Sequence, residues 1–486
     1  MDHLAASNLT EAGASRAPIV ETPHLSRTDS TSKSTTSLNQ RNAHGIGSWL
    51  AGQLEENKPK GAIASLDGVR ALACLTVIGY HISLMTHDMR LWSTNNPLIN
   101  SVLLAGGAGV TLFFVLSGFL LFLPYAKALA SDQSWPSTRL FYMRRALRII
   151  PGYYFSLFLL VLLAKPEYLE PQRWKELILF PLFLMDSTKA TFQQLNGPYW
   201  TLAIEWQFYL LLPLIVLGIR FVARRIRSER RWWVVVGCLL GMIGWGLLTR
   251  ALGSYFMAHP AATFLVPRSV LNVVLFFTYG FSGKYLEDFA VGMLAGLAYT
   301  FLYTPTVRVK LCLHARRVSP WFWGAGLLLL LFMAMQHYSL DFHYTWPILP
   351  ALFQLPGWLH ELGFSLGFGF CILTILFGPT WLRKPFEWGP LRWIGLISYS
   401  LYIWHLPLLF TFLHHVGPSL SNLPHPLAYS LYWVWAAVVV IPCSFALYTL
   451  IEKPGMRLGS RLRGQFAAQQ GQARITKRLA PTGERL

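Results

Sequence analysis

Long apolar runs recur along almost the whole chain, and their lengths are close to what an α-helix needs to cross a lipid bilayer. The hydrocarbon core of a bilayer, about 30 Å thick, needs about 20 residues of helix. Ten segments fit this pattern: residues 68–86, 102–125, 149–164, 199–222, 232–252, 285–303, 321–336, 361–378, 394–413 and 427–451. Because helices satisfy their own backbone hydrogen bonds in lipid, these runs predict an all-α, polytopic membrane protein with about ten transmembrane helices.

The composition excludes other classes of protein. Of the 486 residues, 53% are hydrophobic and only 13% are charged, whereas soluble domains carry about 25% charged residues. Five cysteines are too few for a disulfide scaffold, and their placement indicates no metal site.

The basic residues that give the net charge of +19 alternate between successive loops of the proposed helices. Of the 41 Lys and Arg residues, 33 fall in the N-terminal segment, the C-terminal tail and every second loop, and 8 fall in the alternate loops. This alternation is typical of the positive-inside rule. It predicts cytoplasmic N- and C-termini in a multi-pass protein, and it argues against a nucleic-acid partner. The membrane we expect is the plasma membrane.

The two ends of the chain differ from its centre. Residues 1–60 contain 14 Ser and Thr residues and no long apolar run, so we expect a disordered cytoplasmic tail. Residues 61–458 form the expected transmembrane domain, and residues 459–486 form a basic cytoplasmic tail.

Few ionisable residues fall inside the proposed helices, where a charge is costly and therefore a functional candidate. The histidines and carboxylates that lie inside a proposed helix and away from its ends are His81, His405 and Glu205. Three further carboxylates, Glu287, Asp288 and Glu361, fall at exterior helix ends, where we expect water to reach them.

The first helix carries Arg70 and His81, eleven positions apart. Eleven residues are three turns plus 20°, so the two side chains share one face and lie roughly 16 Å apart along the axis. Glu205 is expected at the same depth as His81, where it could orient the imidazole of a catalytic base. The alternative is a histidine bonded only to a backbone carbonyl or a hydroxyl.

Arg145 and Arg148 lie three residues apart, on one face of the next basic helix end. They either hold the orientation of the chain or join Arg70 at the cytoplasmic membrane edge to bind phosphates. Asp67 is expected to cap the first helix or to pair with Arg70.

Two aromatic residues are candidates for the acceptor side. Trp200 lies five residues before Glu205 in sequence. His405 either lines the acceptor side or is buried and bonded to Tyr399 or Ser398.

Six segments together carry a family pattern. They are SLDGVRALACLTVIGYH (65–81), GVTLFFVLSGFLL (109–121), FYMRRALRIIPGYY (141–154), PYWTLAIEWQFYLLLP (198–213), WIGLISYSLYIWHLPL (393–408) and LIEKPGMRL (450–458). In this order they resemble the acyltransferase-3 family of integral-membrane acyltransferases, whose signature includes an arginine, ten residues and a histidine.

The resemblance implies transfer of an acyl group, most often acetyl from acetyl-CoA, to a hydroxyl of a carbohydrate or related acceptor. It implies that Arg70, Arg145 and Arg148 hold the donor's phosphates. His81 would be the general base or a covalent acyl carrier, with Glu205 as its partner. No permanently bound cofactor is implied; the partners are acyl-CoA, a carbohydrate or lipid-linked glycan, and membrane lipid.

A transporter or flippase of a glycan or lipid-linked metabolite is the alternative, because a buried histidine and glutamate could relay protons. The sequence lacks the paired interrupted helices and the two similar halves that many such transporters show.

Overall fold

The computed structural model describes residues 52–54, 63–86, 96–130, 134–227, 230–302, 309–342, 344–346, 355–420 and 422–465. Most of the expected N-terminal tail, and the chain after residue 465, lie outside them. The described residues form helices and loops, with one isolated bridge between Phe264 and Val266 and no named strand. The all-α class is therefore confirmed.

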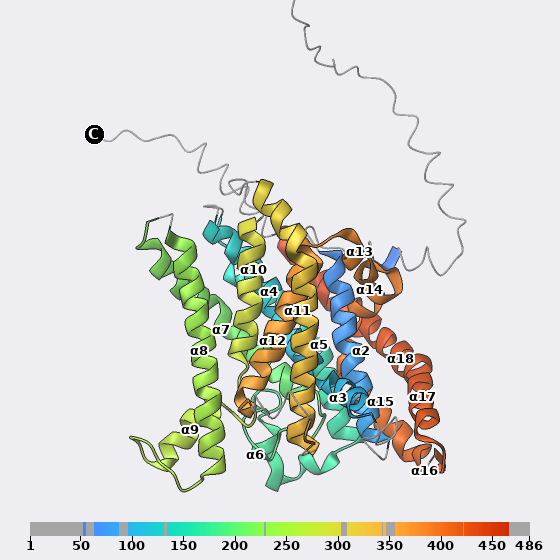
Figure 1. The fold of residues 1–486 in the computed structure, drawn as a ribbon. Helices are drawn as coiled ribbons and strands as arrows, with labels where there is room; N and C mark the ends of the chain where they lie inside the picture. Colours follow the sequence, from blue (N-terminus) through green and yellow to red (C-terminus); the bar gives the residue numbers. More distant parts are fainter. Residues whose placement is uncertain are drawn as a thin grey trace, which may run out of the picture. The chain divides into compact units, whose positions relative to one another are not determined.

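The α-helices follow one another in the order labelled in Figure 1. They are α2 (Ala64–Met85), α3 (Pro97–Leu104), α4 (Gly109–Ala130), α5 (Thr138–Leu163), α6 (Trp174–Leu177), α7 (Tyr199–Arg224), α8 (Arg231–Ala258), α9 (Arg268–Thr278), α10 (Leu286–Leu302), α11 (Val309–Phe342), α12 (Gly357–Phe377), α13 (Thr380–Arg383), α14 (Gly389–Leu396), α15 (Ser398–His415), α16 (Gly417–Leu420), α17 (His425–Trp435) and α18 (Ile441–Leu447).

All ten segments expected to span the membrane are helical, but not all are full spans. Within the described residues, eight helices are long and apolar enough to cross a membrane, or nine if the pair α14 and α15, bent by 75°, counts as one. The segment expected at 285–303 forms α10, which has only 17 residues and begins with two carboxylates. The last span, His425–Gln465, continues beyond residue 458.

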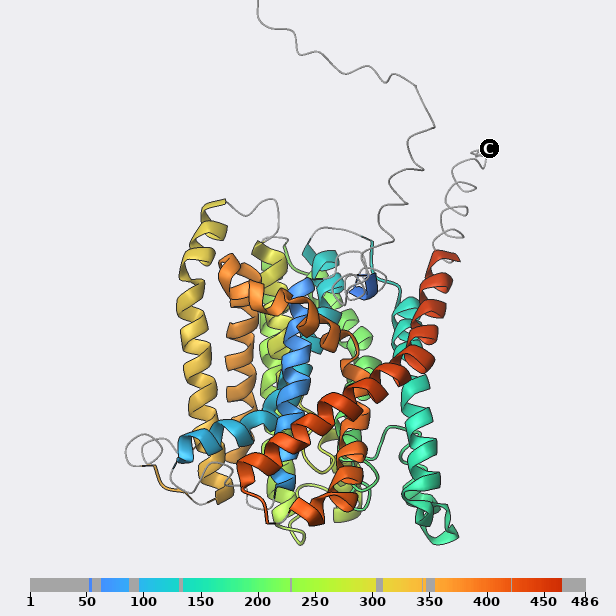
Figure 2. The same cartoon turned by 90° about the vertical axis from the view of Figure 1, so that its right-hand side faces the viewer.

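The last span is bent rather than straight (Figure 2). It contains two π-helical segments, Ala436–Val440 and Tyr448–Glu452, on either side of α18. In the second of these, the carboxylate of Glu452 accepts a hydrogen bond from Ser400 of α15. This contact joins the last span to α15, the helix that carries His405.

Two glycines let α4 and α10 pack backbone against backbone. A side chain at Gly118 would overlap the carbonyl oxygen of Phe289, and one at Gly292 would overlap that of Val115. Small residues allow this close approach between helices in a membrane, where dispersion contacts drive packing. The crossing fixes the position of Ser117, the residue next to Gly118.

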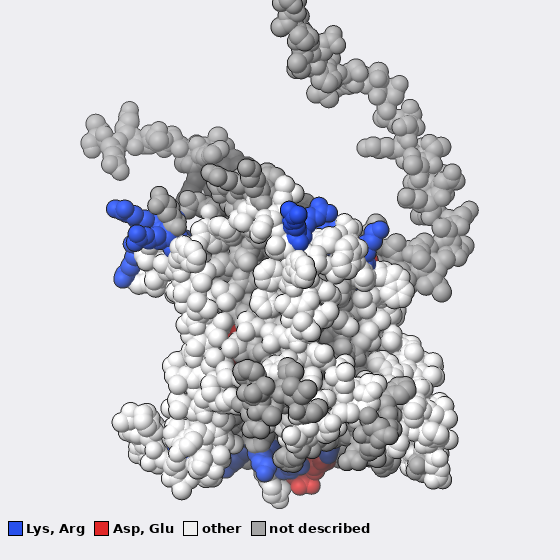
Figure 3. Space-filling model, in the orientation of Figure 1, with Lys and Arg blue, Asp and Glu red and all other residues white. Residues whose placement is uncertain are grey.

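Charge is distributed unequally between the two ends of the helix bundle (Figure 3). Exposed basic side chains such as Arg230, Arg316 and Arg317 lie at the end where α8 and α11 begin. At the opposite end basic and acidic side chains occur together, as in the ion pairs of Arg173 with Glu167 and Glu176. One end is therefore predominantly basic.

Candidate active site

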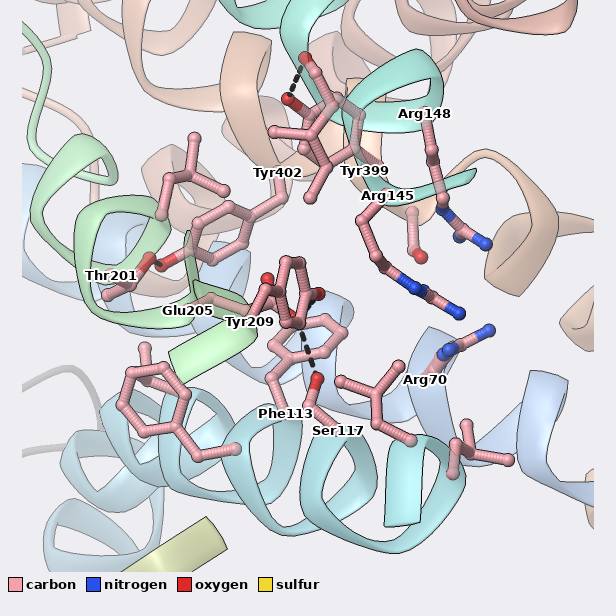
Figure 4. Close-up of a pocket in the computed structure, with 17 residues that line it drawn as sticks. Arg70, Phe113, Ser117, Arg145, Arg148, Thr201, Glu205, Tyr209, Tyr399 and Tyr402 are labelled. Carbon is pink, nitrogen blue, oxygen red and sulfur yellow. Dashed lines mark hydrogen bonds between the residues drawn. The ribbon is translucent and has the colours of Figure 1, made fainter. Parts of the chain in front are cut away.

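Five helices, α2, α4, α5, α7 and α15, surround a cavity of about 760 Å³ counted to its open mouth (Figure 4). Its lining residues are Arg70, Val110, Phe113, Phe114, Ser117, Leu120, Leu121, Arg145, Arg148, Ile149, Thr201, Leu202, Glu205, Tyr209, Ser398, Tyr399 and Tyr402. Four of the residues selected from the sequence, the three arginines and Glu205, lie in this one cavity.

The guanidinium groups of Arg70, Arg145 and Arg148 lie side by side (Figure 4). Within the described residues, no carboxylate lies within ion-pair distance of any of the three. Arg145 lies over the ring of Tyr209, 5.7 Å from its centroid, and its buried Nε has no hydrogen-bond partner. Asp67 and Glu205 attract Arg70 and Arg145, respectively, only from beyond ion-pair distance. Buried positive charges without an ion-pair partner are costly, so the cavity is suited to an anion such as a phosphate.

Glu205 lies in the same cavity and is held by two hydroxyl groups. Ser117 of α4 donates a hydrogen bond of 2.5 Å to its Oε1, and Tyr209, one turn further along α7, donates to the same oxygen. The contact with His81 expected from equal depth is not formed. Counting residues from a helix end gives a depth in the membrane but not the neighbouring helix that a side chain faces, and Glu205 faces α4.

His81 lies instead against His405 of α15. The Nδ1 of His81 is 3.2 Å from the Nε2 of His405 and 2.9 Å from the carbonyl oxygen of Val77. The Nδ1 of His405 lies 2.8 Å from the carbonyl oxygen of Tyr402 and 3.3 Å from that of Leu401. His405 is fully buried, whereas His81 is half-buried.

The two residues expected as partners of His405 make other contacts, Tyr399 through its hydroxyl and Ser398 through its backbone carbonyl. Tyr399 donates a hydrogen bond of 2.8 Å to the carbonyl oxygen of Ile149, and the carbonyl oxygen of Ser398 faces the thiol of Cys74 at 3.7 Å. The histidine pair joins α2 to α15. The two residues are far apart in sequence, so only tertiary packing brings them together.

Tyr402 connects the cavity with the histidine pair. Its ring lines the cavity, its hydroxyl lies 2.8 Å from that of Thr201, and its ring centroid is 5.7 Å from that of His405. Sequence reasoning missed Tyr402, Ser117 and Tyr209. The available signal was the polar residues within apolar spans, in LSGF, WQFYL and SYSLY.

Two other candidates lie away from the cavity lining. The indole of Trp200 packs between Phe192 and Tyr285, with centroid distances of 5.4 and 5.5 Å. Asp67 caps no helix, because the N-cap residue of α2 is Ile63. Its carboxylate lies 3.9 Å from Arg392 and attracts Arg70 from beyond ion-pair distance, so the capping role is not found and the expected pair is a longer-range attraction.

The expectation that water reaches Glu287 and Asp288 is wrong, because both are buried at 1% and 0% exposure. Arg250 of α8 forms an ion pair of 2.6 Å with Glu287, and Ser365 of α12 donates a hydrogen bond of 2.6 Å to Asp288. These partners come from other helices, so position along α10 gave no indication of them.

Comparisons with known proteins identify the family of the chain. A family model described as an acyltransferase domain, that of the acyltransferase-3 family, matches residues 63–449. The chain is 26% identical over 420 residues to the Bacillus subtilis protein YrhL, which has a provisional peptidoglycan O-acetyltransferase name, covering 82% of this chain and 56% of that one. It is 26% identical over 361 residues to the peptidoglycan O-acetyltransferase OatA of Listeria monocytogenes, covering 71% and 49%.

A Staphylococcus aureus protein with a provisional O-acetyltransferase name is 24% identical over 375 residues, covering 72% of this chain and 51% of that one. The chain thus spans about half the length of these curated relatives. No solved structure matches it significantly.

Proposed function

Because the chain belongs to the acyltransferase-3 family, we propose that it is a membrane-bound O-acyltransferase that moves an acetyl group from acetyl-CoA to a hydroxyl of a glycan. The observation that carries the proposal is the cluster of three guanidinium groups, without carboxylate partners among the described residues, in one cavity between the helices. Coenzyme A is a phosphorylated donor, and its phosphates are the anions that such a cluster binds.

The donor would enter at the basic end of the bundle. Arg70 lies near the beginning of α2 and Arg145 near that of α5, and these arginines would hold the phosphates there. An extended thioester arm would then follow α2 past the ring of Tyr402 toward His81, which is roughly 16 Å further along the axis. Glu205 would be a positioning residue on the donor side, because it holds Tyr209 beneath Arg145.

His81 would act as the general base at the far end of this path. Its Nε2 takes the proton of the acceptor hydroxyl while the oxygen forms a bond to the thioester carbonyl carbon. The carbon–sulfur bond breaks, and the imidazolium returns the proton to the leaving thiolate. A covalent relay, in which the acyl group first moves to His81, would use the same nitrogen.

The acceptor class follows from the relatives. Their names specify peptidoglycan, so we propose a cell-envelope glycan, approaching from the less basic end, where Trp200 and its aromatic neighbours lie. The basic end would face the cytoplasm of a plasma-membrane protein, as the positive-inside rule predicts.

The test uses the full chain in nanodiscs with acetyl-CoA labelled in the acetyl group and a soluble glycan acceptor. We expect acetyl transfer by the wild type, none by His81→Ala, and a raised KM for acetyl-CoA in Arg148→Ala. Full activity in His81→Ala would overturn the role of His81. Glycan flux across proteoliposomes without any acylated product would instead establish the transporter.

A further inference from the structure

The two histidines form the end of a chain of hydrogen bonds whose proton positions can be worked out. The Nδ1 of His405 faces two backbone carbonyl oxygens, those of Tyr402 at 2.8 Å and Leu401 at 3.3 Å. A carbonyl oxygen only accepts, so Nδ1 of His405 carries the proton. In a neutral imidazole the other nitrogen, Nε2, is then an acceptor.

The same reasoning then applies to His81. Its Nδ1 faces the Nε2 of His405 at 3.2 Å and the carbonyl oxygen of Val77 at 2.9 Å. Both are acceptors, so Nδ1 of His81 carries the proton and donates to them. The lone pair of His81 is consequently on Nε2, which forms no hydrogen bond to the described residues.

We propose that His405 is a positioning residue, which fixes the tautomer and the ring orientation of His81 so that Nε2 is the basic nitrogen. The inference rests on the proposed function and assigns His405 a role other than contact with the acceptor. It corresponds to the role of the carboxylate in a catalytic triad, which orients the base and supports the imidazolium that forms. Here a neutral imidazole serves instead of a carboxylate.

Burial supports this role over acceptor binding. His405 is fully buried, at 0% exposure, while His81 is half-buried. A fully enclosed side chain cannot contact a glycan without rearrangement of α15. His81 can be reached, and its unbonded Nε2 is the atom that the acceptor hydroxyl requires.

The backbone of α15 is held in place around His405. Pro407 has no N–H, so the carbonyl oxygen of Ile403, four residues earlier, has no partner within the helix. Asn196, from the loop before α7, donates a hydrogen bond of 3.0 Å to that oxygen. His405 therefore lies on a segment tied to α7, and a positioning residue needs such rigid support.

The test compares two substitutions of His405 in the full chain in nanodiscs. In His405→Gln the side-chain amide N–H can donate to the Tyr402 carbonyl and its oxygen can accept from His81, so the hydrogen-bond chain is preserved. In His405→Leu both contacts are lost at similar volume. His360→Leu is the matched control, because His360 is also buried, at 4% exposure, on α12.

We expect His405→Leu to lower kcat by about 10- to 100-fold, part of what a positioned general base contributes, with KM for acetyl-CoA unchanged. We expect His405→Gln to restore most of kcat and His360→Leu to keep the wild-type value. A merely structural role would not give a fall in kcat at constant donor KM that the amide rescues.

Three outcomes would overturn the inference while leaving the proposed function intact, provided that His81→Ala is inactive. They are wild-type kcat in His405→Leu, equal losses in His405→Leu and His405→Gln, and a raised KM for the glycan at constant kcat, which would indicate acceptor binding. Full activity in His81→Ala would remove the role of His81 on which the inference rests, and absence of acetyl transfer by the wild type would remove the proposed function itself.

Discussion

Ser117 of α4 donates a 2.5 Å hydrogen bond to Glu205 of α7. This hydrogen bond joins the two helices inside the cavity that Arg70, Arg145 and Arg148 line. Tyr209 donates to the same carboxylate oxygen. Glu205 therefore organises hydroxyl groups in the cavity that the three arginines line, rather than the imidazole of His81. This difference determines what a substitution at Glu205 should change.

We expect Glu205→Ala to lower the free energy of unfolding by about 1–3 kcal/mol, because two half-buried or buried hydroxyl groups lose their acceptor. Glu205→Gln keeps an oxygen at the same place and should retain most of the stability. Thermal unfolding in nanodiscs measures the difference. Equal midpoints for the two variants would show that the hydroxyl contacts carry little of the stability.

Replacement of Arg145 or Arg148 by Ala should weaken acetyl-CoA binding by about 10-fold or more for each, since a hydrogen bond to a charged group contributes about 1.5–3 kcal/mol. Binding should also weaken with added salt. Equilibrium binding of labelled acetyl-CoA provides the measurement. Arg316→Ala, at an exposed arginine outside the cavity, is the control; an equal loss there would indicate a diffuse effect of surface charge.

Gly118→Ala should destabilise the bundle by about 1–3 kcal/mol, as overpacking does, because the new methyl group overlaps the backbone of α10. Gly218→Ala is the matched control, since a side chain there meets nothing within 4 Å. Thermal unfolding of both variants tests the close crossing of α4 and α10. Identical midpoints would be inconsistent with it.

Arg250→Met should cost about 3–5 kcal/mol, because Glu287 is left buried without its counter-charge. The double variant Arg250→Met, Glu287→Leu should recover much of that loss, since replacement of a buried ion pair by apolar residues is often close to neutral. A double-mutant cycle on unfolding free energies measures the coupling. Additive losses would mean that the pair is not coupled.

The orientation of the chain is testable with a membrane-impermeant maleimide. In a Cys312→Ser background, Lys175→Cys should be labelled on intact cells, and Arg316→Cys only after the cells are opened. The expectation follows from the basic end, which includes Arg316, facing the cytoplasm. Labelling of Arg316→Cys on intact cells would reverse the proposed topology.

Individual residues show most clearly which features could be predicted from the sequence. Apolar runs predicted the all-α membrane fold because the length and hydropathy of a span are local properties. Helical periodicity related Arg70 to His81 because both lie on one helix. The neighbours of Glu287 and Asp288 could not be predicted in this way, because Arg250 and Ser365 come from other helices.

The sequence by itself therefore determined the fold class, the positions of the apolar helical segments, the basic end and the residue types available for chemistry. Tertiary structure alone decided which of them meet: His81 with His405, and Glu205 with Ser117. The physical reason is that a helix fixes depth and face only relative to its own axis. Its rotation against its neighbours is set by packing such as the glycine contact between α4 and α10.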